Sequence, residues 1–422
     1  MQTSSTEAPR PTDFEGAQLD LLRPLVALFA AFAILILGNG LASTLLVLGA
    51  GRLGASDALT GALTSGYYAG YAAGAVLGAA LVRRAGPVRT FAALASLVSA
   101  MTLVHALVPS VPAWVLLRIA TGARFAVLVL VVEAWINAAT PTHARGRTLS
   151  LYGLTFLMGG AGSQQLLNIA DPAGFALFAV ASILVSLSLV PVTLARVREP
   201  EGLGGGRLGL GALWSASPFG VASVIAVAAA VAAFWGLGPA YARAAGLDDA
   251  ALSVFMSAAL GAAALTQWPM GWLSDRVDRR LVLIGALAIA ALSSGALWLL
   301  APTGPVLIAL AAMFGAGVQP AYSLAVAHAN DRLPGRAVEV AGGLILPYGM
   351  AAAAAPLLAG AAMDAAGPGA LFGTLALTTG GTALLGAARL RRAAVPEADK
   401  RAYEESPRTT HAATYLSGSA RA

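Results

Sequence analysis

The amino-acid sequence predicts an all-α integral membrane protein with about 12 transmembrane helices in two pseudo-symmetric six-helix bundles. The chain is 58% hydrophobic and 11% charged, with a mean hydropathy of +0.76, a composition foreign to soluble domains. Apolar runs recur along its 422 residues, and a bilayer core of about 30 Å needs roughly 20 apolar residues per helix. One polar, glycine-rich stretch near the middle divides these runs into six and six.

Gly and Pro occur in most of the short connections between the apolar runs. The first run is too long for the core of a cleaved signal peptide, so we expect it to be a transmembrane helix of the mature protein. The expected spans are 24–50, 58–82, 89–109, 112–138, 148–169, 174–194, 218–240, 250–272, 281–301, 304–328, 338–362 and 368–389.

Basic residues predict the orientation, because Lys and Arg accumulate in short cytoplasmic loops. Of the 26 Lys and Arg, 22 fall in the tails and even-numbered loops, while Arg52 and Arg243 fall in the opposite loops and two lie within the fourth span. We therefore expect a multi-pass protein of the plasma (inner) membrane with both termini cytoplasmic. Its expected parts are a cytoplasmic tail 1–23, a bundle 24–194, a cytoplasmic linker 195–217, a bundle 218–390 and a cytoplasmic, disordered tail 391–422.

The net charge of +6 is spread over short loops rather than gathered in one patch. This distribution favours lipid headgroups over nucleic acid as a partner. The absence of cysteine excludes disulfides and thiolate metal sites. We expect no cofactor and no metal.

Two segments repeat between the halves. GAALVRRAGPVR (78–89) follows the second span, and GWLSDRVDRR (271–280) follows the eighth, about 193 residues later. Spans four and ten align at an offset of 195, which places Gly122 on Gly317, Arg124 on Gln319 and Glu133 on His328. Two six-helix halves related by an axis along the membrane normal are a known transporter plan.

The loop GWLSDRVDRR resembles the signature loop of the major facilitator superfamily, with its Gly, Leu, acid, Arg and closing basic pair. Arg118 followed by Gly122 resembles the superfamily's Arg-x-x-x-Gly motif in the same helix. The wider pattern is similar to the YcaD-like branch, in GNGLASTLLVL (38–48), TGALTSGYYAGYAAG (60–74), VVEAWIN (131–137), AFWGLGPAYA (233–242) and AVAHANDR (325–332). The resemblance implies the major facilitator fold and solute transport, with no substrate assigned.

The resemblance also implies that the signature loop is a cytoplasmic latch, whose residues control conformation rather than bind substrate. In the first-half copy, Arg83 stands where the acid is expected. Glu133 lies nine residues after Arg124, on the opposite helix face; we expect it to pair with the first-half loop, the alternative being a proton-carrying role. The expected gate residues are Arg83, Arg84, Glu133, Gly271, Asp275, Arg276, Arg279 and Arg280.

An ionisable group at the centre of a membrane helix costs at least roughly 2.5 to 3.5 kcal/mol, so it should face protein or water. The resemblance places spans one, four, seven and ten around a central cavity, where Arg124 would face Gln319 and bind substrate. The alternative is an arginine bonded to nearby backbone carbonyls. Other cavity candidates, each of which could instead bridge helices or join an aromatic belt, are Asn39, Gln164, Gln165, Trp235, Tyr241, Gln267, Gln319 and Tyr322.

The sequence therefore predicts an alternating-access transporter of a small organic solute that is anionic or amphipathic. A coupling proton is expected from the resemblance alone, because His105 and His328 lie toward helix ends and no Asp or Glu is central. The alternatives are a membrane receptor or sensor that does not transport, and an intramembrane enzyme. The enzyme is disfavoured because paired central carboxylates, HExxH and a nucleophile constellation are all missing from the sequence. We expect a monomer with bound lipid.

Overall fold

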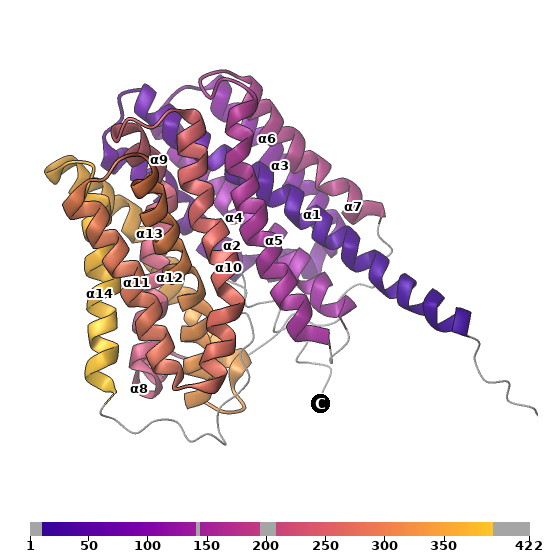
Figure 1. Ribbon diagram of the computed structural model, residues 1–422. Coiled ribbons are helices and arrows are strands. Elements are labelled where there is room, and N and C mark those ends of the chain that lie inside the picture. The colour runs from indigo at the N-terminus through magenta and orange to yellow at the C-terminus, as the bar shows by residue number, and fades with distance from the viewer. Residues whose placement is uncertain (1–10, 141–143, 195–207, 391–422) are drawn as a thin grey trace, which may run out of the picture.

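The computed structural model describes residues 11–140, 144–194 and 208–390, and in these ranges the chain folds into helices without any strand (Figure 1). The expectations for residues 1–10, for most of the linker (195–207) and for the tail 391–422 lie outside this part of the chain.

The first half contains six long helical segments. The fifth ends in a 3₁₀ turn, η2 (Leu166–Ile169), and the sixth is split into two helices at Ser188. The helices are α1 (Pro11–Arg52), α2 (Asp57–Ala85), α3 (Pro87–Leu107), α4 (Val111–Ala139), α5 (Arg145–Gln165), α6 (Ala176–Leu187) and α7 (Leu189–Leu194).

The second half repeats this plan after a short linker helix, α8 (Leu210–Ala216), which the sequence did not predict. Leu213 of α8 is fully buried and lies against Gly343, so the end of the linker packs on the second half. The six helices are α9 (Pro218–Ala244), α10 (Asp249–Arg276), α11 (Arg279–Leu300), α12 (Gly304–Arg332), α13 (Ala337–Ala366) and α14 (Ala370–Arg389).

Apart from the start of α1, the helix boundaries lie within about four residues of the expected spans, and two of the differences have a clear cause. The helix α1 begins at Pro11, although its membrane-crossing part begins only at Leu25; proline has a backbone angle suited to the first position of a helix, and polarity alone does not prevent helix formation. The fifth span ends as an α-helix at Gln165 rather than at 169, because the last four residues tighten into η2.

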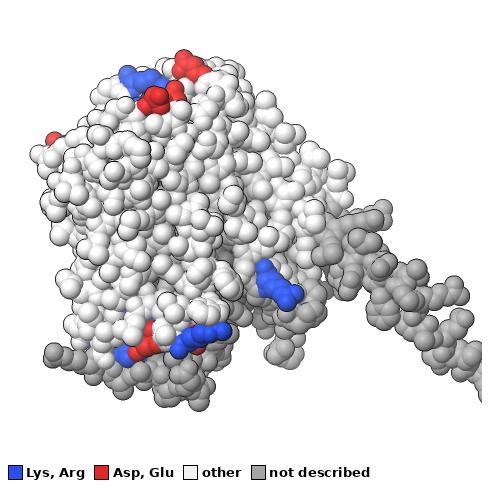
Figure 2. Space-filling view, in the orientation of Figure 1, with Lys and Arg blue, Asp and Glu red and all other residues white. Residues whose placement is uncertain are grey.

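Ten helical segments within the described residues are long and apolar enough to cross a membrane. The other two long helices are α2 and α5, which have a similar length but are rich in Gly, Ser and Tyr and include arginines near one end. Both pack between other long helices of the bundles. In the space-filling view, charged side chains lie near the two ends of the helices and the belt between them is uncharged (Figure 2), as a bilayer-spanning surface requires.

The two halves correspond helix by helix, and the offset is 193 residues for the pair α4 and α12. The bounds of α4 and α12 differ by 193 at both ends. A Cβ at Gly122 would lie 2.0 Å from the Tyr67 carbonyl oxygen of α2, and a Cβ at Gly315 would lie 2.0 Å from the Ala259 carbonyl oxygen of α10. Gly122 therefore corresponds to Gly315, and the predicted offset of 195 for this helix pair was wrong by two residues.

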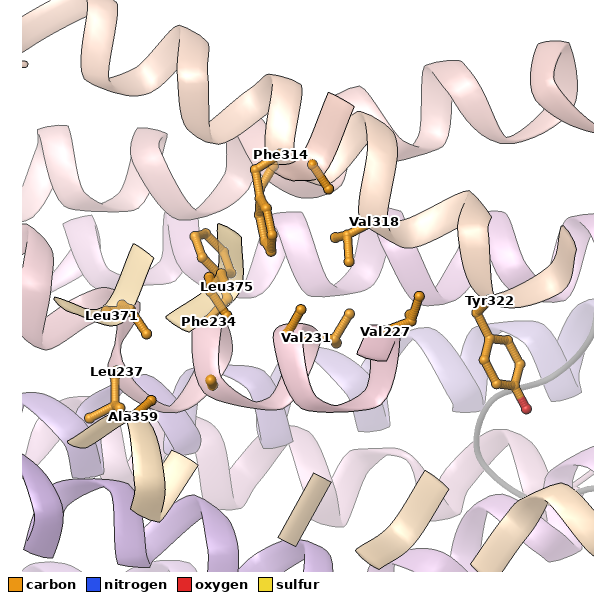
Figure 3. Packing of buried hydrophobic residues seen from close by; sticks show 14 of the residues in the cluster. Val227, Val231, Phe234, Leu237, Phe314, Val318, Tyr322, Ala359, Leu371 and Leu375 are labelled. Atoms are coloured by element: carbon orange, nitrogen blue, oxygen red, sulfur yellow. The ribbon is translucent and has the colours of Figure 1, made fainter. Parts of the chain in front are cut away.

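Helix α9 packs against α12, α13 and α14 of the second bundle and also contacts α1 and α2 of the first. Its residues Val231 and Phe234 pack against Phe314 and Val318 of α12 and Leu375 of α14 (Figure 3). Between the bundles, α2 packs on α13 and α5 on α10, which are symmetry-related contacts. We call the end of the molecule that carries α8 the linker face, and the opposite end, where α2 begins and α13 ends, the distal face (Figure 1).

Candidate functional site

A cavity of about 150 Å³ lies between the two bundles. Most of its wall comes from α1, α2, α4 and α5, and the second bundle closes it with residues of α9, α10 and α13. The lining residues are Ile36, Asn39, Gly40, Ser43, Thr44, Thr64, Tyr67, Tyr68, Tyr71, Arg118, Phe125, Phe156, Gly160, Ser163, Gln164, Val231, Trp235, Leu260 and Tyr348.

Arg118 is the charged residue among the described lining residues, and it is 4% exposed. Its Nη2 donates to Ser43 Oγ at 3.2 Å, and its guanidinium carbon lies 4.2 Å from the centroid of the Tyr67 ring. The structure gives Arg118 no carboxylate partner among the described residues. An arginine has five N–H donors, so most of this group remains available to a ligand.

The polar part of the wall is a chain of hydrogen bonds between α1 and α5. Thr44 Oγ1 donates to Gln164 Oε1 at 2.9 Å, and Gln164 Nε2 donates to Ser163 Oγ at 3.0 Å. Asn39 Nδ2 points to Tyr67 Oη at 3.5 Å. These bonds fix the side chains around Arg118 before any ligand arrives.

Close packing of α2 on α4 brings the Tyr67 ring against the guanidinium of Arg118. Gly70, Gly74 and Gly122 all lie at this contact, where an added Cβ would come within 2.1 Å of a backbone oxygen of the facing helix. Arg118 and Gly122 are one helical turn apart, so they share the face that meets α2. The small residues let the helices touch, as in other membrane bundles.

Three of the predicted cavity residues, Asn39, Gln164 and Trp235, line this cavity. Arg124 does not. Its Nη1 donates to the Ala120 carbonyl oxygen at 2.8 Å, which is the backbone-bonded alternative considered from the sequence. The cation of the cavity is therefore Arg118, which the sequence indicated only as a family motif. Six residues rotate a helix by 600°, so the two arginines point in different directions.

The other predicted cavity residues lie elsewhere. Gln165 bonds across to α10 near the distal face, and Tyr241 packs edge-on against Phe372 at 4.7 Å. Gln267 points to Ser323 at 3.5 Å inside the second bundle. Gln319 is also buried inside the second bundle. Tyr322 is buried and packs edge-on against Tyr348, and it is Tyr348 that lines the cavity.

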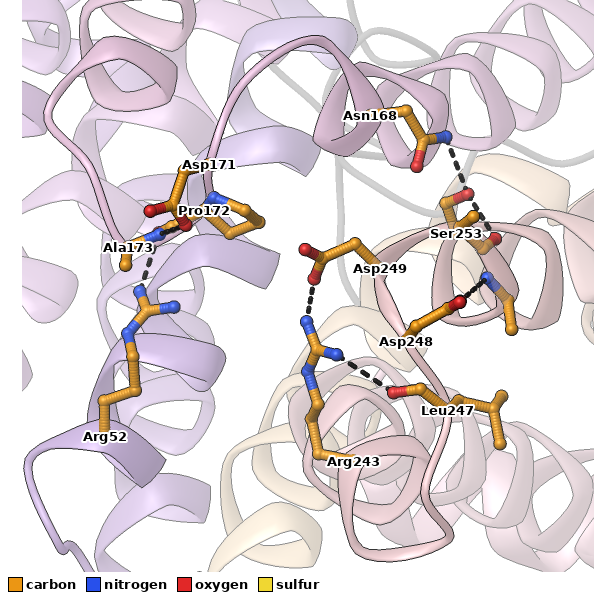
Figure 4. Close-up of polar contacts among 12 residues, drawn as sticks. Arg52, Asn168, Asp171, Pro172, Ala173, Arg243, Leu247, Asp248, Asp249 and Ser253 are labelled. Carbon is orange, nitrogen blue, oxygen red and sulfur yellow. Dashed lines mark hydrogen bonds and ion pairs between the residues drawn. The ribbon is translucent and has the colours of Figure 1, made fainter.

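Hydrogen bonds join the bundles at the distal face. The Asp364 carboxylate of α13 accepts from the backbone N–H groups of Asp57 and Ala58, at 2.7 and 3.0 Å, and so caps the start of α2. Asn168 Nδ2 donates to Ser253 Oγ at 2.9 Å (Figure 4). In addition, Gln165 Nε2 donates to Ser257 Oγ at 2.5 Å and Leu357 N–H donates to Ser65 Oγ at 3.1 Å. The partners lie far apart in sequence, and no motif in the sequence indicates them.

Arg279 of the signature loop lies in a buried ionic network at the linker face. It bonds Asp331 at 2.7 Å and Asp275 at 3.1 Å, and the Arg279 and Asp331 side chains are each 3% exposed. Arg280 pairs with Asp278 at 2.7 Å, and the Arg276 guanidinium lies 3.9 Å from the Trp272 ring centroid. Asp331 lies within the segment AVAHANDR (325–332), but the sequence alone did not indicate it as a gate residue.

Glu133 is also buried, and accepts a hydrogen bond from Tyr152 Oη at 2.6 Å. Arg83 and Arg84 lie exposed at the end of α2. The proposed ion pair between Glu133 and this loop stays a prediction. No group of three or more His, Asp or Glu suited to a metal occurs in the part of the chain that the structure describes.

Comparisons with known proteins agree on the family. The family model for the Major Facilitator Superfamily matches residues 28–263 and 219–420. The MFS-type transporter YcaD of Salmonella paratyphi B is 25% identical over 222 residues, which are 52% of this chain and 57% of that protein, so the chain spans little more than half of this relative's length.

Solved structures share the fold. A bacterial homolog of the human lysosomal transporter Spinster, in an inward-facing and unoccupied conformation, has a TM-score of 0.66 at 15% identity over 97% of this chain and 98% of its own. The nucleoside transporter NupG has a TM-score of 0.68 at 12% identity over 87% of this chain and 98% of its own. The family model covers nearly the whole chain, and the chain belongs to the Major Facilitator Superfamily of membrane transporters.

Proposed function

We propose that this transporter moves a small organic anion across the membrane by alternating access, and that Arg118 binds the anion. The observation that carries this proposal is the position of Arg118, a buried cation that borders the cavity between the bundles and has no carboxylate partner among the described residues.

An unpaired charge in a membrane protein is costly, which makes an intramembrane arginine a marker of function. A carboxylate or similar anion would compensate the charge of Arg118 with charge-assisted hydrogen bonds, which are about twice as strong as neutral ones. The surrounding hydroxyl and amide groups of Ser43, Thr44 and Gln164 are already bonded to protein. These groups therefore hold the cavity wall in place, whereas Arg118 supplies the attraction for an anion.

Alternating access requires the bundles to separate at each face in turn. The hydrogen bonds of Asp364, Asn168, Gln165 and Ser65 support a state closed at the distal face. With both termini cytoplasmic, as the basic loops predict, the distal face is the outer one and this state opens inward. Among the described residues, the cavity lining contains no Asp, Glu or His, so we expect a coupling proton to bind outside these lining residues.

A ligand-dependent thermal-shift screen on the purified protein tests the proposal, over organic anions, cations and neutral metabolites. We expect anions to raise the melting temperature of the wild type and of Arg124→Gln, but not of Arg118→Gln. Stabilisation by cations or neutral solutes alone would overturn the proposal, and so would anion binding that survives in Arg118→Gln.

A further inference from the structure

Aromatic side chains make up more than a third of the cavity wall. Seven of its nineteen lining residues are aromatic, whereas aromatic residues are 7% of the whole chain. They approach from both bundles: α2, α4 and α5 on one side, α9 and α13 on the other. They are Tyr67, Tyr68, Tyr71, Phe125, Phe156, Trp235 and Tyr348.

The rings next to Arg118 are held in place by one another. Tyr67 lies 5.5 Å from Tyr68 at an interplanar angle of 83°, 6.1 Å from Tyr71 and 6.2 Å from Phe125, between ring centroids. Edge-on and tilted pairs at such distances are the favoured arrangements of aromatic rings. A wall that is already ordered loses little conformational freedom when a ligand binds.

The second bundle fixes its two rings in the same way. Trp235 stands edge-on to Phe234 at 5.5 Å and 83°, and Tyr348 stands edge-on to Tyr322 at 5.4 Å and 77°. Phe234 and Tyr322 are both fully buried in the second bundle. The two cavity rings therefore face the first bundle from a rigid support.

The cavity has room for one aromatic ring. Its volume is about 150 Å³, and an engineered apolar cavity of about 150 Å³ in another protein binds benzene. Arg118 is the one cation among the described lining residues, and it sets the charge of the ligand. A phosphate ester carries a charge of about −1.5 to −2 at neutral pH, and one arginine would leave part of that charge uncompensated.

We propose that the transported anion is an aromatic monocarboxylate, with its carboxylate on Arg118 and its ring between the tyrosines of α2 and Trp235. This inference rests on the proposed function, because it needs Arg118 to bind an anion. It adds that the anion has an aromatic ring and a single negative charge. The ring follows from the aromatic wall and the size of the cavity, and the single charge follows from Arg118.

Isothermal titration of the full-length protein in detergent tests the ring with two matched probes, benzoate and cyclohexanecarboxylate. The two acids carry the same charged group and similar bulk, but only benzoate has a π face. We expect benzoate to bind about 3- to 10-fold more tightly, in keeping with the preference between aromatic rings. Phenyl phosphate serves as the doubly charged probe, and we expect it to bind more weakly than benzoate.

Variants locate the effect. Trp235→Leu should weaken benzoate severalfold and leave cyclohexanecarboxylate unchanged, and Arg118→Gln should abolish the binding of both. The matched control is Trp268→Leu, because Trp268 is 72% exposed and lies outside the cavity wall; it should change neither affinity.

Equal affinities for the two acids, both lost in Arg118→Gln, would overturn the aromatic inference and leave the proposed anion transporter intact. Tighter binding of phenyl phosphate than of benzoate would overturn the inference that the transported anion carries a single charge. Failure of all three anions to bind the wild type would overturn the inference, and the thermal-shift screen over other organic anions tests the proposed function separately.

Discussion

The guanidinium of Arg118 lies 4.2 Å from the ring centroid of Tyr67, and the backbone of Tyr67 touches the same helix one turn further on, at Gly122. The two defining residues of the Arg-x-x-x-Gly motif thus act on one residue of α2. Gly122 lets α2 approach α4, and this approach brings the Tyr67 ring under Arg118. Tyr67 therefore connects the packing of α2 on α4 with the position of the Arg118 guanidinium in the cavity wall.

Adding a methyl group at Gly122 should disturb both the packing of α2 on α4 and the position of the Tyr67 ring beside Arg118. In Gly122→Ala, the new Cβ would lie 2.0 Å from the Tyr67 carbonyl oxygen, so α2 must move away from α4. Overpacking of this kind costs about 1–3 kcal/mol. We expect a lower melting temperature, followed by intrinsic tryptophan fluorescence, together with weaker anion binding.

The matched control is Gly285→Ala in α11, where an added Cβ meets nothing within 4 Å. Alanine is favoured over glycine inside a helix by about 0.5–1 kcal/mol, so this variant should be as stable as the wild type or more so. An unchanged melting temperature in Gly122→Ala would show that the α2–α4 contact is looser than described.

The ion pair of Arg279 and Asp331 should dominate the linker-face network. Removing one partner of a buried pair leaves an uncompensated charge, and in Asp331→Asn the remaining contact of Arg279 with Asp275 compensates only part of it. We expect a loss of as much as about 3 kcal/mol. Asp275 is 35% exposed at its side chain, so Asp275→Asn should have a much smaller effect. Equal melting temperatures of the two variants would contradict this ranking.

The contact of Asp364 with the start of α2 should hold the distal face closed. Replacing a helix cap by alanine costs about 1 kcal/mol, so Asp364→Ala should shift the population toward the state open at this face. The chain has no cysteine, which allows a single reporter, Val231→Cys, in the cavity wall. In intact cells, we expect an impermeant thiol reagent to modify this cysteine roughly fivefold faster in Asp364→Ala, because about 1 kcal/mol corresponds to that factor.

Asp171→Ala is the control for this measurement. Asp171 also bonds a backbone N–H at the distal face, that of Ala173, but within one bundle (Figure 4). Its substitution should leave the modification rate unchanged. Equal rates in the Asp364 and Asp171 variants would exclude Asp364 as a gate residue.

Glu133 should have a structural role through its bond to Tyr152. Tyr152→Phe removes the hydroxyl that donates to the buried carboxylate at 2.6 Å, and a hydrogen bond within a protein contributes about 0.5–1.5 kcal/mol. We expect both Tyr152→Phe and Glu133→Gln to lower the melting temperature while the pH dependence of transport stays that of the wild type. A shifted pH profile in Glu133→Gln would instead favour a proton-carrying role.

Most of the fold could be predicted from the sequence, because membrane helices depend on local composition. The runs of apolar residues indicated the long helices, and the loop 271–280 indicated the family. The offset of 195 was wrong because an alignment of span four with span ten does not say which helix each glycine meets. Contact of Gly122 with Tyr67 and of Gly315 with Ala259 shows the correspondence.

The cavity was only partly predictable. Arg118 and Arg124 lie on the same helix, about 9 Å apart along its axis, and depth in the membrane favoured Arg124. The direction of each side chain depends on which helices pack around α4, and a single sequence does not contain this information. The same holds for Asp364 and Asp57, whose contact joins positions 307 residues apart.

Uptake of small monocarboxylates into proteoliposomes tests the central claim most directly, with Arg118→Gln and Arg124→Gln measured beside the wild type. The account predicts uptake above that of protein-free liposomes for the wild type and for Arg124→Gln, and none for Arg118→Gln. Uptake by Arg118→Gln at the wild-type rate, or no uptake of any monocarboxylate by the wild type, would contradict the claim that Arg118 binds a transported anion.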